Sequence, residues 1–371
     1  MQDSLRGTSC CAQGASCIIG VEEESPHGSI AYAESEDALW DSALKCKKGV
    51  SAKPSVKQFC NHIATEVCRM HRQLADGTWE DGDAHPVTIL YPKKREGLAI
   101  RFRDRVYQRS LNDNIIYPAM TKSFIRSNCA CQHGRGPDYA RKLVKKSLHR
   151  IFIRYGYDFY VLQIDVKGYY PHMRHDKIAE LFREKLDGEV ADRVERILAK
   201  QGNTGEGVGY HPGSQLVQIA GISLLDRIDH SIKERLGCHD YIRVMDDMLL
   251  LHPVREYLEV CLGEIVGWLA DLGLETNVKK THITPISDGF TFLGFRYAPG
   301  QHREFYMSPK GQGVKHEKKK LYRLRKKGDR AKADECLQSF VAHLKHGNTQ
   351  RLQQRLWRWQ DDLWRQKDDV S

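Results

Sequence analysis

Short apolar runs separated by polar breaks recur through the middle of the chain. The clearest is YIRVMDDMLLL, from Tyr241 to Leu251, in which two runs rich in Ile, Val, Met and Leu enclose the pair Asp246-Asp247. Two such runs around a two-residue polar break predict a β-hairpin whose tip carries both carboxylates. Asp-Asp lacks the glycine that a tight hairpin turn prefers, and adjacent like charges repel each other. The arrangement therefore favours a compensating cation.

A further apolar run, from Phe159 to Ile164, ends at a third acid, Asp165. If two buried strands bring three carboxylates to one point, the site suits Mg²⁺, which is commonly held by one or two carboxylates plus substrate phosphates. Two such ions, about 3.5–4 Å apart, can lower the pKa of an attacking hydroxyl and stabilise a leaving pyrophosphate. The alternative, a solvated turn, suits an isolated Asp-Asp pair but does not explain the third acid.

Apolar positions at helical spacing predict the surrounding helices. Those from Val56 to Leu74 predict one amphipathic helix. Further helices are expected over residues 139–155, 178–200 and 214–236, and from the acidic hairpin to about Leu272. Residues 281–285 and 290–297, separated by the turn Asp288-Gly289, predict another hairpin. The order strand, helix, hairpin, helix, hairpin predicts an α/β (α+β) fold with a mainly antiparallel sheet.

Basic residues alternate with apolar ones between Lys93 and Arg105. On a hairpin turning at Glu96-Gly97, this alternation places Arg101, Arg103 and Arg105 on one face. A triphosphate is a natural ligand for an arginine there, and a merely solvated face is the alternative.

The overall charge strengthens the interpretation that the partner is a polyanion. Lys and Arg (58) outnumber Asp and Glu (48), which gives a net charge of +10. Nucleic acid is the simplest interpretation of this polyanion, and a membrane surface is the alternative. We see no transmembrane run and no signal peptide, and expect a cytoplasmic protein with no membrane partner.

The 11 cysteines are an odd number and predict free thiols rather than a disulfide scaffold. Two groups could be imagined as zinc ligands, Cys129-Ala-Cys131-Gln-His133 and the trio Cys10, Cys11 and Cys17. Neither has the paired CxxC spacing of a structural zinc site.

The composition becomes strongly basic after Pro309. Many cations face few acids there, and Trp357, Trp359 and Trp364 follow in a segment with helical spacing. We interpret the tryptophans as core rather than as a surface that stacks bases. The basic part suits contacts with a phosphate backbone. At the other end, residues 1–50 are expected to be an N-terminal extension that is partly mobile.

Several motifs occur in a recognisable order between residues 85 and 300. In chain order, these motifs are Tyr91 to Gln108, Ser127 to Gly136, Asp165-Val-Lys-Gly-Tyr-Tyr170-Pro, Val244-Met-Asp-Asp247, Asn277-Val-Lys-Lys280 and Phe292-Leu-Gly-Phe295. This series resembles the reverse transcriptases of prokaryotes, a group that includes group II intron, retron, diversity-generating retroelement and phage-defence enzymes. Within it, the chain is most similar to the diversity-generating and defence-associated enzymes.

The resemblance implies a right-hand polymerase fold and a role for each matching residue. Residues 51–160 would form fingers, 161–305 a palm and 306–371 a helical basic thumb. Asp165, Asp246 and Asp247, with Val166, would hold two Mg²⁺ ions, for which Mn²⁺ can substitute. Arg95 would contact the triphosphate, Tyr170 would exclude a 2′-hydroxyl, Gln215 would line the nucleotide pocket, and Lys280 would protonate the leaving pyrophosphate. The thumb residues expected to hold nucleic acid are Lys318, Lys319, Lys320 and Arg323.

Two departures from the family pattern stand out. Val244 replaces the usual tyrosine of the YxDD box, and the segment from Val208 to Gln215 lacks the family's common QGxxxSP. Gln215 after Ser214 is closer to the SQ form of diversity-generating retroelement enzymes. Since this segment helps judge the incoming nucleotide, fidelity and priming are the properties that the departures affect.

The function that follows is RNA-templated DNA synthesis in a prokaryotic retroelement or antiphage defence system. Its partners would be an RNA template, in particular a dedicated non-coding RNA, a DNA primer or product, and dNTPs, with an accessory protein or a homo-oligomer as further possibilities. Three alternatives remain open. Two are enzymes on the same palm, an RNA-templated RNA polymerase and a template-independent nucleotidyl transferase, and the third is a catalytically silent RNA-binding scaffold.

Overall fold

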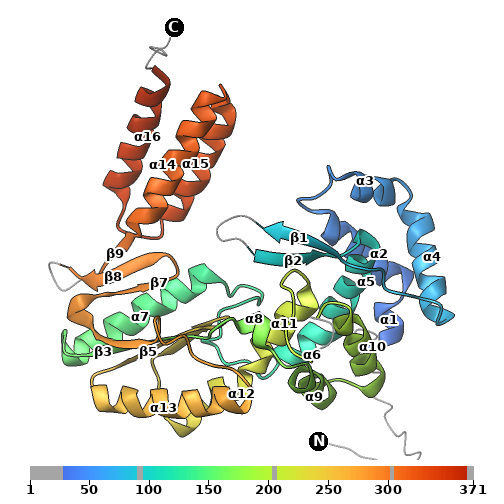
Figure 1. Ribbon diagram of the computed structural model, residues 1–371, viewed down its shortest axis with the longest axis horizontal. Coiled ribbons are helices and arrows are strands. Elements are labelled where there is room, and N and C mark those ends of the chain that lie inside the picture. Colours follow the sequence, from blue (N-terminus) through green and yellow to red (C-terminus); the bar gives the residue numbers. More distant parts are fainter. Residues whose placement is uncertain (1–27, 90–94, 203–206, 301–304, 366–371) are drawn as a thin grey trace, which may run out of the picture.

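The computed structural model of the protein describes residues 28–89, 95–202, 207–300 and 305–365 (Figure 1). The side chains of Ile89 and Arg95 also lie outside the described part. Most of the predicted N-terminal extension, residues 1–27, lies outside it as well. The rest of that extension forms α1 (Ile30–Ala33) and α2 (Glu36–Lys47), whose buried Ala33 and Leu39 belong to the main hydrophobic core.

The first part of the chain is mostly helical. Helices α3 (Pro54–Asn61) and α4 (Ile63–Ala75) lead to two short antiparallel strands, β1 (His85–Ile89) and β2 (Arg95–Ala99). Helix α5 (Phe102–Leu111), a π-helical turn (Asn112–Ile116) and α6 (Tyr117–Thr121) follow. Helix α5 contacts α2 and α3, so this part of the chain packs as one unit beside the strands.

A four-stranded antiparallel sheet lies at the centre of the molecule, in the order β4-β5-β3-β6. Its strands are β3 (Tyr160–Asp165), β4 (Tyr241–Val244), β5 (Asp247–His252) and β6 (His282–Pro285). The predicted acidic hairpin is confirmed, since β4 and β5 pair from Tyr241↔Leu250 to Val244↔Asp247. Strand β3 lies between β5 and β6: it pairs with β5 along its whole length and with β6 from Tyr160 to Gln163.

Alternating side chains of the sheet pack against two long helices. Val161, Leu249 and Ile242 share a core with α7 (Pro137–Tyr155), which contacts β4 and β5. Leu162 and Leu250 face the other way, toward α13 (Arg255–Asp271). Because residues of a strand alternate between faces, the apolar runs on these strands cover both faces of the sheet. The sheet is antiparallel throughout and is packed against helices, which confirms the α+β class.

The connections between these strands are helical. Helices α8 (Tyr169–His172), α9 (His175–Lys185), α10 (Gly188–Ala199), α11 (Gln215–Leu224) and α12 (Asp226–His230) lie between β3 and β4, and a π-helical turn (Ser231–Arg235) follows α12. The predicted helix over 139–155 and the helix after the acidic hairpin are confirmed by α7 and α13.

The C-terminal part consists of a small sheet and a helical bundle. Strands β7 (Phe290–Phe292), β8 (Phe295–Pro299) and β9 (Phe305–Pro309) form a three-stranded antiparallel sheet. Helices α14 (Gly311–Lys326), α15 (Arg330–Leu344) and α16 (Gln350–Arg365) have their own core and extend away from the central sheet (Figure 1). Trp359 and Trp364 pack against that core, as predicted, whereas Trp357 is exposed.

Three predicted helices are each divided in the structure. The helix over 56–74 is split into α3 and α4 at His62, whose φ of −123° and ψ of 30° are not helical. The helix over 178–200 becomes α9 and α10, and Leu186 between them is extended. The helix over 214–236 is interrupted at Leu225, between α11 and α12. Apolar spacing continues across each break because both pieces face the same core.

Two predicted hairpins were wrong. Glu96 and Gly97 are not a turn but lie within β2, and Arg103 and Arg105 belong to α5. Phe102 and Val106 are buried four residues apart, so the helical period prevails over the alternation. Residues 281–297 do not form one hairpin either: β6 joins the central sheet, a 3₁₀ turn (Ile286–Asp288) follows, and the hairpin is made by β7 and β8.

The cysteines that the structure describes are all unpaired, which agrees with the prediction of free thiols. Cys129 is buried and Cys131 exposed, while Cys10, Cys11 and Cys17 lie outside the described residues. Among the described helices, none is long and apolar enough to cross a bilayer.

Candidate active site

The sheet brings the three predicted acids to one end of its two central strands. Asp165 is the last residue of β3 and lies opposite Asp247, the first residue of β5. Asp246 precedes it in the turn, together with Met245, whose φ of +56° is in the left-handed region. The sequence placed both acids at the tip, but only Asp246 is in the turn, because Asp247 already pairs with Val244.

Two cavities meet at Asp165. The first, of about 620 Å³, is lined by Asp165 and Asp246 with Val166, Tyr170 and Lys280. The second, of about 570 Å³, is lined by Asp165, Asp247 and Lys280, and by Leu293 and Gly294 of the β7–β8 turn. Asp165 therefore faces both spaces, Asp246 only the first and Asp247 only the second.

The acids interact electrostatically. Burial raises the pKa of Asp247 to about 6, and the charges of Asp246 and Asp165 add to this rise. The ammonium of Lys280 lies 2.6 Å from Oδ1 of Asp165, and this hydrogen bond raises the pKa of Lys280. The lysine is half exposed, so it can leave this position when a cation of higher charge binds.

Backbone hydrogen bonds place Lys280. The segment after α13 runs beside the residues that follow β3: the amide of Asn277 donates to the carbonyl of Asp165 (2.7 Å), and the amide of Lys167 donates to that of Glu275 (2.8 Å). The amide of Lys280 then donates to the carbonyl of Asn277 (2.9 Å), which closes a turn. Lys280 is thus fixed to the same backbone as Asp165.

Two tyrosines form the floor of the first cavity. Tyr169 is buried and donates from its hydroxyl to the carbonyl of Gly221 in α11, while Tyr170 lines the cavity. A Cβ added at Gly221 would lie 3.2 Å from Cε1 of Tyr170. The absence of a side chain at 221 therefore allows the tyrosine ring to lie against the helix.

The donor atoms suit a hard divalent cation. Within the described ranges, no group of three or more His, Cys, Asp or Glu side chains converges as a metal site. Mg²⁺ does not need one, because it is commonly bound by one or two carboxylates together with waters and substrate phosphates. Asp165 and Asp246 on one cavity provide that pair. The charges of Asp246 and Asp165, which add to the effect of burial on the pKa of Asp247, also indicate a site with excess negative charge.

Other predicted site residues lie at different distances from this centre. The side chain of Arg95 is outside the described residues, although its neighbour Glu96 lines the first cavity. Gln215 begins α11 and is not among the residues that line that cavity. The cavity is lined instead by Tyr210, His211 and Pro212, which precede α11. The cations at 318–320 and 323, which were predicted to hold nucleic acid, are on α14, in the separate bundle.

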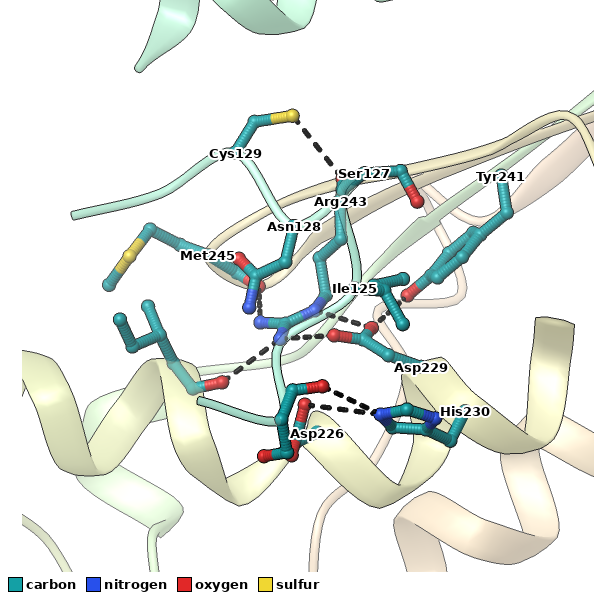
Figure 2. A network of polar contacts seen from close by, with 12 residues as sticks. Ile125, Ser127, Asn128, Cys129, Asp226, Asp229, His230, Tyr241, Arg243 and Met245 are labelled. Atoms are coloured by element: carbon teal, nitrogen blue, oxygen red, sulfur yellow. Dashed lines mark hydrogen bonds and ion pairs between the residues drawn. The ribbon is translucent and has the colours of Figure 1, made fainter. Parts of the chain in front are cut away.

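Sequence reasoning missed a buried ion pair beneath the acidic turn. Arg243 of β4 and Asp229 of α12 are both fully buried and form two hydrogen bonds, of 2.6 and 2.7 Å (Figure 2). Tyr241 donates to the same carboxylate (2.6 Å). An arginine in the middle of a strand of Tyr, Ile and Val was the signal that could have revealed it, because a buried charge requires a partner.

A family model decides what kind of protein this is. Residues 99–297, more than half of the chain, match the family described as reverse transcriptase (RNA-dependent DNA polymerase). The chain belongs to the reverse transcriptase family. The predicted fold class is thereby confirmed, and the matched region contains all three acids and Lys280.

Solved structures of telomerase are similar to this chain. One, from Candida albicans in complex with a fragment of telomeric RNA, aligns with a TM-score of 0.46 and 13% identity over 62% of this chain and 46% of that one. An apo telomerase from Candida tropicalis, truncated from the C-terminal domain, gives a TM-score of 0.42 and 13% identity over 58% and 53%. The chain thus matches about half the length of these structures. No curated protein matches the sequence.

Proposed function

We propose that this protein synthesises DNA on an RNA template by metal-dependent nucleotidyl transfer at Asp165 and Asp246. The observation that carries the proposal is that both carboxylates line one cavity within the reverse transcriptase region, with Tyr170 and Lys280 beside them. Divalent cations bound there would neutralise phosphate charge and promote deprotonation of the primer 3′-hydroxyl. Mg²⁺ is the cation proposed, with Mn²⁺ as a substitute.

The residues of the chain would then have distinct tasks. Asp165 and Asp246, with the backbone of Val166, would hold the cations, and Asp247 would support them from the second cavity. Tyr170 would contact the sugar and reject a 2′-hydroxyl. Lys280 would hold a proton close to the leaving pyrophosphate, because it lines the same cavity as Asp165 and Asp246.

Further binding roles follow the same proposal. Arg95 would contact the triphosphate and Gln215 would act next to the nucleotide. The second cavity, between Asp247 and the β7–β8 turn, would receive the primer end. Residues 51–160, 161–305 and 306–371 would serve as fingers, palm and thumb, and the cations of α14 would hold the template–primer duplex through its phosphates.

The biological setting belongs to the proposal as well. We infer a prokaryotic enzyme of a retroelement or an antiphage defence system, working in the cytoplasm with a dedicated non-coding RNA. What supports this is the motif series, in particular Ser214-Gln215 in place of the more common QGxxxSP. Sequencing of the DNA made in cells that express the protein would identify the template, and cellular genomic fragments without a common RNA source would contradict this setting.

Primer extension by the purified chain tests the activity. We expect extension of a DNA primer that depends on an RNA template, dNTPs and Mg²⁺, and a loss of about 10²–10³-fold or more in Asp165→Asn and Asp246→Asn. Asp271→Asn, at an exposed position at the end of α13, is the matched control.

Three outcomes would favour the alternatives. Extension without a template would identify a terminal transferase, and efficient use of NTPs an RNA polymerase. Retention of biological activity by Asp246→Ala combined with Asp247→Ala would identify an RNA-binding scaffold.

A further inference from the structure

Arg243 connects the acidic turn to three other segments. Its Nη1 donates to the carbonyl of Met245 (2.9 Å), and its Nη2 donates both to Asp229 (2.6 Å) and to the carbonyl of Ile222 (2.9 Å). Figure 2 shows the guanidinium between the carboxylate of Asp229 and the backbone of Met245. The main chain of Arg243 is also held, because its amide donates to the carbonyl of Ser127 (2.9 Å).

The turn that Arg243 contacts has a backbone conformation that side chains disfavour. Met245 has φ +56°, and only glycine adopts this region without steric cost. A non-glycine residue stays there only when its surroundings impose it. The hydrogen bond from Arg243 to the Met245 carbonyl is such a constraint, and it acts on the residue just before Asp246.

The break in the helix at Leu225 provides the other anchor. The last four carbonyls of a helix have no partner within the helix, and in α11 these belong to residues 221–224. The carbonyl of Gly221 accepts from Tyr169, and the next one, of Ile222, accepts from Arg243. A cation at this end also interacts favourably with the helix dipole. Tyr169, beneath the first cavity, and Arg243, beneath the acidic turn, are thus hydrogen-bonded to adjacent carbonyls of α11.

We propose that Arg243 is the positioning residue of the metal site: with Asp229, it holds the Met245 turn against α11 so that Asp246 faces the cavity that Asp165 lines. This inference rests on the proposed function. The arginine touches neither substrate nor cation and acts through the backbone of the turn. The buried pair carries no net charge, so it orients Asp246 without neutralising it.

The proposal predicts a defect in cation binding that glycine can repair. Because removal of the arginine alone would leave Asp229 buried without its partner, the test variant is Arg243→Met with Asp229→Asn, which keeps an acceptor for Tyr241. We expect Mn²⁺ binding, measured by electron paramagnetic resonance on the free protein, to weaken at least about tenfold. Adding Met245→Gly should restore most of it, because glycine adopts the turn without the constraint. Arg243→Lys should give an intermediate loss, since lysine keeps the charge but not the fork.

Two further variants make the result specific. Asp246→Asn in the otherwise wild-type chain defines which part of the Mn²⁺ signal belongs to this site. Leu258→Ala, at a buried position on α13, should destabilise the fold without touching the turn. Thermal melts compare its loss of stability with that of the Arg243 variants. The Mg²⁺ concentration for half-maximal primer extension should rise by the same factor as the Mn²⁺ dissociation constant in the Arg243 variants, but not in Leu258→Ala.

The outcomes separate this inference from the function on which it rests. Wild-type Mn²⁺ affinity in the folded Arg243→Met/Asp229→Asn variant, an equal loss in Leu258→Ala, or failure of Met245→Gly to restore binding would each overturn the positioning role alone. Absence of any Asp246-dependent Mn²⁺ binding in the wild type would overturn both the positioning role and the proposed function.

Discussion

Gly221 controls the space available to the two tyrosines beneath the first cavity. A Cβ at this position would lie 3.2 Å from Cε1 of Tyr170 and 3.4 Å from Cε1 of Tyr169. Such contacts are tighter than ordinary packing, so one of the rings would have to move. The ring of Tyr170 is the nearer of the two, so it is the ring that we expect to move.

Substitutions at 170 and 221 should therefore affect nucleotide use in different ways. We expect Tyr170→Ala to raise the use of NTPs relative to dNTPs by about 10–100-fold, because the ring no longer meets a 2′-hydroxyl. Gly221→Ala should push the ring into the cavity and lower the use of both. Ratios of kcat/KM for dNTPs and NTPs measure the effect, with Tyr155→Ala, at an exposed position on α7, as the control. An unchanged ratio in Tyr170→Ala would remove the role given to Tyr170.

At this scale, the sequence revealed residues whose types are rare in their surroundings. Asp165, Asp246 and Asp247 interrupt or end apolar runs, and the structure brings them to the same end of the central sheet. Gly221 gave no such signal, because its importance depends on tyrosines about fifty residues earlier. Asp229 was missed for a related reason: an acid in a helix is usually exposed, and only the fold shows that this one faces Arg243.

Among the elements, α5 and the segment before β1 contain two neighbouring acids, the buried Asp104 and the half-buried Asp81. Asp104, in the first turn of α5, is 3% exposed and accepts from the amide of Gly82 (3.1 Å). Burial raises its pKa to about 6, and the nearby Asp81 adds to the rise. Burial also raises the pKa of Asp81. At neutral pH, the carboxylates of Asp81 and Asp104 thus repel each other, and both lose hydration by burial.

This pair predicts a specific dependence of stability on pH. The pKa of Asp104 is higher in the folded protein than in the unfolded chain, so folding takes up a proton, and stability increases as the pH falls through about 6 toward 4. Asp104→Asn lacks this change. A shift of about two pKa units corresponds to about 3 kcal/mol in the free energy of unfolding at neutral pH. The gain expected in Asp104→Asn is smaller than this by the contribution of the hydrogen bond from Gly82.

Thermal melts between pH 5 and pH 8 measure the difference. We expect Asp104→Asn to be more stable than the wild type at pH 7.5, with the advantage shrinking toward pH 5. Asp83→Asn, at an exposed position in the same segment, is the control for the loss of one acid. A variant less stable than the wild type throughout this range would show that the charge of Asp104 is favourable where it is.

The helices and strands also show which features the sequence patterns do not predict. Strands β3, β4 and β5 follow from short apolar runs in the sequence, and the long helices α7 and α13 were also predicted from it. The break at Leu225 does not, because apolar residues continue through it at helical spacing. It arises because carbonyls of α11 bond to Tyr169 and Arg243, which are distant in the sequence. The alternation around Arg103 likewise predicted a strand, but its guanidinium stacks on Trp79 from a helix.

In the whole molecule, the basic C-terminal bundle is separate from the acidic site, and its cations are not equivalent. Lys318 of α14 is half-buried, with its ammonium 4.7 Å from the ring centroid of Trp359, and Lys320 pairs with the buried Glu317 (3.6 Å). Lys319 and Arg323 are exposed, and no ion pair engages either of them within the described residues. The four residues that the sequence treated as one group therefore divide into two that stabilise the bundle and two that are available to a ligand.

This division predicts how salt should affect binding of an RNA–DNA duplex. Each phosphate contact contributes about 0.7–0.9 to the slope of log K against log salt concentration, because binding releases a counterion. Lys319→Gln with Arg323→Gln should therefore lower the slope by about 1.5 and leave the melting temperature unchanged. Lys318→Gln with Lys320→Gln should lower the melting temperature, since the first loses the contact with Trp359 and the second leaves Glu317 buried without its cation. Fluorescence anisotropy at several salt concentrations, with parallel melts, measures both effects. Equal slopes in the two double variants would show that the exposed cations of α14 do not face the duplex, and the nucleic-acid path would then have to follow another surface of the molecule.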